Sequence, residues 1–91
     1  MNSTDRTSLI ALANTLRSAQ LEANAIDILA PQDGVYGDIG KSLFDVLVLL
    51  TGDESSAFEV TDMLVDSGED VTYCMMYLHA RAIRSASKFA V

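Results

Sequence analysis

The sequence predicts an all-α protein, a compact four-helix arrangement in a single helical domain, residues 1–91. Apolar residues recur every three or four positions in four separate segments, which is the spacing of an amphipathic helix. Glycine, proline and capping residues separate these segments. We expect long N- and C-terminal helices, an apolar central helix and one short helix, and 91 residues suffice for one small core.

The most apolar run of the chain, residues 43–50, predicts the helix at the centre of the core. Its composition fits either a buried strand or a buried helix, but its flanks favour a helix. Gly37-Asp38 offers a cap, and Gly52 suits the position just after the last helical residue. A helix this apolar needs neighbours on two sides. Its narrow polar arc consists of Lys41, Ser42 and Asp45.

The first predicted helix begins near Asp5. Ser3 and Thr4 can cap it, and Pro31 ends it at or before Ala30. Unbroken, it would be about 35 Å long, which is long for so small a domain. It therefore wraps the core, breaks near Asn24, or packs partly against a second subunit. Its apolar seam is Leu9, Leu12, Leu16, Ala19, Ala23, Ile26 and Ala30.

Residues 31–37 are predicted to form a loop, because Asp33-Gly34 is a turn signal. Tyr36 is expected to fill an apolar position beneath this loop. Asp33 and Asp38 suggest a cation site only weakly, since their spacing lacks the ligand series of a calcium loop.

The third predicted helix is short. It opens with the capping-box pattern of Ser56 and Glu59, and Ser67-Gly68 stops it. Glu69-Asp70 then begins the fourth helix, where negative charge favours the helix N-terminus. The face of the fourth helix that we expect to be buried is Val71, Cys74, Met75, Leu78, Ala82, Ala86 and Phe89.

Composition restricts the cellular setting and the classes of partner. The net charge of −7 disfavours nonspecific binding to nucleic acid or to anionic membrane, because both need a positive surface. The single cysteine, Cys74, excludes an internal disulfide and fits a reducing compartment. The first residues lack the apolar core of a signal peptide, so we expect a cytoplasmic protein.

No pattern in the sequence indicates catalysis, a metal site or a cofactor, and we expect a protein that is not an enzyme. His79, the only histidine, is expected at the margin of the core rather than as a general base or pH switch. Cys74 would point about 140° away from it on a straight helix, which excludes a nucleophile pair. Gly40-Lys41-Ser42 matches the end of a phosphate-binding loop, but Val35 stands where the first glycine is required.

Two exposed surfaces are candidate sites of interaction. One face of the fourth helix combines tyrosine with basic side chains, as binding hot spots often do, or else pairs with acids of a neighbouring helix. An acidic band beginning at Asp53 and Glu54 is either a solvated face or a docking surface. The interface candidates are Tyr73, Tyr77, Arg81, Arg84 and Lys88. The acidic docking residues are Glu59, Asp62, Asp66, Glu69 and Asp70.

We therefore expect a small, non-catalytic interaction or regulatory protein that forms a homodimer or binds another protein. The alternative is an inhibitor, or a mimic of nucleic-acid charge, that docks its acidic band on a basic site of another macromolecule. A helix-turn-helix over residues 56–84 is disfavoured, because its recognition helix would open with Glu69-Asp70. No membrane, metal or direct nucleic-acid partner is expected.

Overall fold

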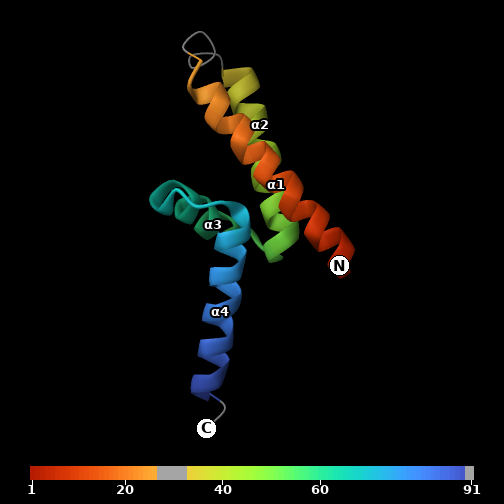
Figure 1. The fold of residues 1–91 in the computed structure, drawn as a ribbon, viewed down its shortest axis with the longest axis vertical. Coiled ribbons are helices and arrows are strands. Elements are labelled where there is room, and N and C mark those ends of the chain that lie inside the picture. Colours follow the sequence, from red (N-terminus) through yellow and green to blue (C-terminus); the bar gives the residue numbers. More distant parts are fainter. Residues whose placement is uncertain (27–32, 90–91) are drawn as a thin grey trace.

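The computed structural model describes residues 1–26 and 33–89, and these residues form four α-helices and no strand (Figure 1). The predicted all-α class with four helices is therefore confirmed. The helices are α1 (Ser3–Asn24), α2 (Asp33–Thr51), α3 (Glu54–Ser67) and α4 (Val71–Phe89).

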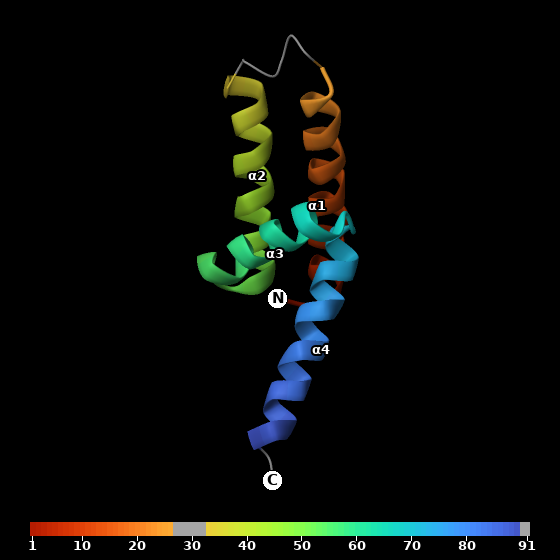
Figure 2. The same ribbon diagram turned by 90° about the vertical axis from the view of Figure 1, so that its left-hand side faces the viewer.

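The helices are arranged as a hairpin, a crossing helix and a projecting helix. α1 and α2 lie side by side and antiparallel, and α3 crosses them near the end of α2 (Figures 1 and 2). α4 starts beside the middle of α1 and continues past the N-terminus (Figure 2). The molecule is consequently 56 Å long but only 27 Å and 19 Å across.

The core lies where the four helices meet, and α2 supplies its centre. Leu47 is fully buried, and its neighbours on the same face of α2 are buried too. α2 packs against α1 on one side and against α3 on another. Its polar arc is narrow, so its wide apolar surface needs these two neighbours. The buried cluster is Ala13 from α1, Leu43, Val46, Leu47 and Leu50 from α2, Ala57, Val60 and Leu64 from α3, and Val71, Cys74 and Met75 from α4.

Two helices begin earlier than the sequence predicts, because a different side chain caps each of them. In α1 the cap is Asn2 rather than Ser3 or Thr4, and its Oδ1 accepts a hydrogen bond from the Asp5 N–H at 2.7 Å. In α3 the cap is Asp53 rather than Ser56. The predicted end of α3 is confirmed, since Gly68 follows it in the left-handed conformation with φ 69°.

The connection between α1 and α2 differs more from the prediction. α1 ends at Asn24, one of the three outcomes expected for the first helix, and α2 begins at Asp33 rather than near Asp38. The predicted loop is therefore wrong over residues 33–37, where the helical conformation extends the pairing with α1. A Cβ at Gly40 would lie 3.4 Å from Gln20 Nε2, so the two helices approach each other closely at this position.

Several expectations about this connection lie outside the described residues. They concern residues 27–32, including the predicted helical positions up to Ala30, and the side chains of Asp33 and Tyr36. Gly40-Lys41-Ser42 lies inside α2, so it does not form a phosphate-binding loop.

Candidate protein-interaction surface

The start of α4 is fixed by three hydrogen bonds to its first backbone N–H groups. Asn14 of α1 contributes its Oδ1, which accepts from the Val71 N–H at 2.8 Å. Asp70 caps the helix, with its side chain accepting from the Tyr73 N–H at 2.9 Å and its carbonyl accepting from the Cys74 N–H at 3.2 Å. Asn14 also donates to the Thr72 hydroxyl at 3.1 Å. The two bonds to Asn14 tie the start of α4 to α1.

The second half of α4 is not buried as predicted. Val71, Cys74 and Met75 are in the core and Leu78 is half-buried, but Ala82 and Ala86 on the same face are exposed. The helical spacing predicts the apolar face correctly, but no other described helix extends far enough to cover it (Figure 1). The side chain of Phe89 lies outside the described residues.

The predicted tyrosine and arginine face of α4 is exposed. Tyr73 is 47% and Tyr77 43% exposed, and Arg84 is exposed about two turns beyond Tyr77 on the same face. Lys88 belongs to the same face by spacing, but its side chain lies outside the described residues. Two aromatic rings and fixed guanidinium charges therefore lie together on one surface of the helix.

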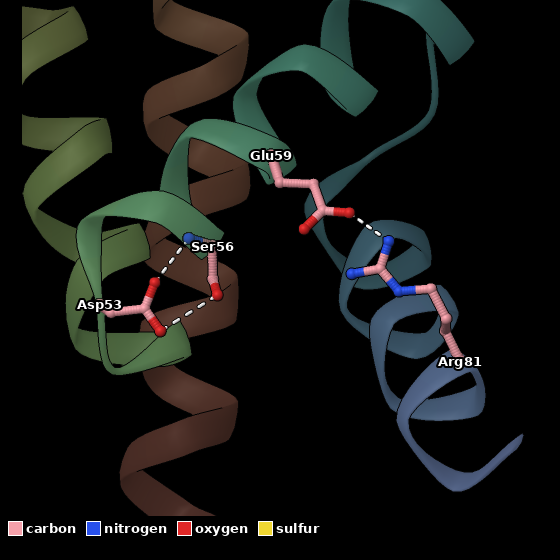
Figure 3. Close-up of polar contacts among 4 residues, drawn as sticks. All are labelled: Asp53, Ser56, Glu59 and Arg81. Carbon is pink, nitrogen blue, oxygen red and sulfur yellow. Dashed lines mark hydrogen bonds and ion pairs between the residues drawn. The ribbon is translucent and has the colours of Figure 1, made fainter. Parts of the chain in front are cut away.

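Arg81, in the middle of this face, pairs with Glu59 of α3 (Figure 3). This is the one salt bridge among the side chains that the structure describes. The hydrogen bond from Arg81 lowers the pKa of the Glu59 carboxyl and raises the pKa of the Arg81 guanidinium. Both side chains are more than a third exposed, at 44% and 39%, so the pair is screened by solvent. The sequence predicted pairing with a neighbouring helix as the alternative role of this face, and for Arg81 that pairing is present.

A groove of about 220 Å³ separates α3 from α4 beside this salt bridge. Its lining combines an apolar floor with polar edges: Met63, Asp66 and Ser67 from α3, and Tyr73 and Tyr77 from α4. The pair of Glu59 and Arg81 spans the same two helices, one turn from Met63 on α3 and one turn from Tyr77 on α4. The groove thus joins residues of the predicted acidic band to residues of the predicted interface.

The predicted acidic band is not uniform. Glu59 is engaged with Arg81, and Asp70 caps α4, so both have roles within the chain. The remaining members, Asp62, Asp66 and Glu69, are exposed. Asp53, at the start of the wider band, accepts from the Ser56 N–H at 2.6 Å and from the Ser56 hydroxyl at 3.2 Å (Figure 3). The backbone hydrogen bond is the main reason that the pKa of Asp53 is lowered.

The charges of the molecule are divided between α4 and the rest of the chain. All 13 acidic residues precede Val71, whereas three of the six basic residues, Arg81, Arg84 and Lys88, lie in α4. The projecting helix is therefore basic on a molecule that is otherwise strongly acidic.

His79 and Cys74 do not form a reactive pair. His79 is exposed, which corrects the prediction that it lies at the margin of the core, because the groove that it lines is open to solvent. It lines an open groove of about 370 Å³ together with Arg6, Leu50 and Met75. Cys74 is fully buried, and burial raises the pKa of its thiol, which disfavours the reactive thiolate.

The described part of the chain offers neither a metal site nor a membrane-spanning helix. No group of three or more His, Cys, Asp or Glu side chains in residues 1–26 and 33–89 is placed to hold a metal ion. Within the same part of the chain, no helix combines the length and the apolar character needed to cross a membrane.

Sequence reasoning missed Asn14. An asparagine in the middle of a long helix is unfavourable for helix propensity, and this was the only signal that its side chain has a specific partner. The partner itself, the backbone of Val71, is 57 residues away and has no signature in the sequence.

Comparisons of the chain with protein-family models, curated proteins and solved structures gave no match.

Proposed function

We propose that this chain is a small, non-catalytic protein–protein interaction or regulatory protein that acts as a homodimer. The observation that carries the proposal is one exposed face of α4, which combines Tyr73 and Tyr77 in its first half with Arg84 in the half that projects from the core. Large apolar or aromatic side chains are exposed on α4, which favours a binding surface over a solvated one. They are Tyr73, Met76, Tyr77 and Ile83.

The residue types on α4 are suited to binding protein. Tyrosine contributes a large contact area at low cost in conformational entropy, and arginine contributes donors in a fixed planar geometry. Arg81 already shows this chemistry within the chain, by pairing with a carboxylate of α3. A partner surface that carries acidic and apolar side chains would complement Tyr73, Tyr77 and Arg84.

Self-association is supported by the division of charge within one chain. A basic helix and an acidic body attract each other between copies as well as within a copy. The sequence-based reason for a dimer was an overlong first helix, and α1 ends at Asn24. The proposal therefore rests on α4 rather than on α1.

A non-catalytic role in the cytoplasm is part of the proposal. Cys74 is single, buried and free, which suits a reducing compartment, and its thiol is not activated. The alternative, an inhibitor that docks its acidic band on a basic partner, has weaker support, because Glu59 and Asp70 already serve contacts within the chain.

Sedimentation equilibrium of the 91-residue chain over nanomolar to high micromolar concentration tests the proposal. We expect a monomer–dimer equilibrium that weakens with added salt, since charged groups contribute to the contact. A chain that stays monomeric at the highest concentration would contradict self-association.

A further inference from the structure

We propose that the groove between α3 and α4 is the interface of a two-fold symmetric homodimer, in which the acidic side of each copy's groove faces the basic side of the other. This inference rests on the self-association proposed above and names the surface that performs it. The occupant of the groove is a second copy of this chain.

The two helices that flank the groove carry opposite charge. On the α3 side, Asp62 and Asp66 are exposed one turn apart, and Asp66 lines the groove. On the α4 side, Arg84 lies on the same helical face as Tyr73 and Tyr77, which line the groove. The ion pair of Glu59 and Arg81 bridges the two sides and shows that their charges are compatible at contact distance (Figure 3).

This division of charge is what a two-fold interface requires. In such an interface both copies use the same patch. A residue on the acidic side of one copy therefore meets a residue on the basic side of the other copy. A patch of one sign would repel its own copy, whereas a patch with an acidic side and a basic side is complementary to itself. We infer that Asp66 of each copy faces Arg84 of the other.

The centre of the patch is apolar, as a dimer interface needs. Met63 is half-buried, and Tyr73 and Tyr77 are 47% and 43% exposed, so much of each ring is free to contact a partner. A groove of about 220 Å³ has room for one large side chain. Under two-fold symmetry, Tyr77 of each copy lies against Met63 and Tyr73 of the other. Hydrophobic contact at the centre and ion pairs at the edges follow the usual anatomy of a protein interface.

Paired charge reversals test the inference with two variants of the full chain. In the homodimer of Asp66→Arg, each new arginine would face Arg84 of the other copy, and in the homodimer of Arg84→Asp, each new aspartate would face Asp66. Each variant alone should dimerise at least about tenfold more weakly than the original chain, because both of its inter-copy contacts become repulsive. A mixture of the two should form a heterodimer, because in that pairing each arginine meets an aspartate.

Sedimentation equilibrium at matched concentrations measures the homodimers and the mixture, and circular dichroism shows that each variant is folded. The control pair is Asp45→Arg and Lys41→Asp, which reverses exposed charges on α2 away from the groove. Heterodimer formation from two weakened variants supports the interface, because unfolding could not produce it. If the original chain dimerises and the Asp66 and Arg84 variants dimerise equally well, this groove is not the interface, although self-association stands. A monomeric original chain would instead remove the proposed function itself.

Discussion

The Asn14 side chain of α1 caps the first residue of α4, since its Oδ1 accepts a hydrogen bond from the Val71 N–H at 2.8 Å. Val71 is fully buried, so this N–H has no access to water when the bond is absent. The Asn14 side chain thus supplies an acceptor for a terminal N–H group that has no partner within α4. The same contact ties the projecting helix to the hairpin of α1 and α2.

Replacement of Asn14 should destabilise the fold. In Asn14→Leu the Val71 N–H loses its acceptor, and a buried donor without a partner costs about 1–3 kcal/mol. Urea unfolding followed by circular dichroism measures the change in the free energy of unfolding. The control is Thr72→Val, which removes only the bond between Asn14 and the exposed Thr72 hydroxyl and should cost no more than about 0.5 kcal/mol. Equal losses in the two variants would assign the stabilisation to Thr72 instead.

The central helix should carry the largest single contribution to the core. Leu47 is fully buried between α1 and α3, so Leu47→Ala should leave a cavity and cost about 2–5 kcal/mol. Leu49, two positions along the same helix, is 60% exposed, and Leu49→Ala should cost less than about 1 kcal/mol. The same urea titration measures both variants. A loss below about 1 kcal/mol for Leu47→Ala would mean that the site collapses or is loosely packed.

The sequence predicts the core and the number of helices, but it does not predict where α2, the second helix of the hairpin, begins. Apolar periodicity identifies Leu47 and Leu64 as core residues, and Gly68 marks the end of α3, because these signals are local. Glycines 34 and 37 read as loop residues, yet both lie in α2, where pairing with α1 outweighs their low helix propensity.

The candidate surface was predicted in part. The spacing of Tyr73, Tyr77, Arg81 and Arg84 places them on one helical face, and the structure shows that face exposed. Helical spacing cannot show whether another element covers an apolar face, so Ala82 and Ala86 were expected in the core. Nor can it show that Glu59, from the acidic band, pairs with Arg81, since that contact depends on the angle between α3 and α4.

Stability should depend on the charge of Asp53 near pH 4. The pKa of Asp53 is lowered in the folded chain, mainly by the Ser56 N–H, so its charged form stabilises the fold above the unfolded-state pKa. That contribution is lost as the pH falls through the folded-state pKa. Asp53→Asn keeps an acceptor for the Ser56 N–H but has no charge, so it should melt at a lower temperature than the original chain at pH 7.

Thermal unfolding at pH 7 and in steps below about pH 4 measures this dependence, because an unperturbed aspartate titrates there. The difference between the original chain and Asp53→Asn should shrink as the solution becomes more acidic. Ser56→Ala is the control, since it removes the hydroxyl bond and retains the backbone bond that dominates the pKa shift. A difference that stays constant over this pH range would show that the charge of Asp53 does not stabilise α3.

The exposed face of α4 should matter more for association than for folding. Tyr77 is 43% exposed and Arg81 forms only a solvent-screened pair, so Tyr77→Ala combined with Arg81→Ala should leave the helical circular dichroism signal unchanged. If this face binds a second copy, the double variant should associate at least about tenfold more weakly, since tyrosine and arginine are the usual hot spots.

Glu59→Gln is the matched control, because it weakens the ion pair within the chain and leaves both α4 side chains in place. Association and unfolding are measured on the same samples. If the face serves only the fold, Glu59→Gln and the double variant should both leave association unchanged, and Tyr77 and Arg81 would then not be binding residues.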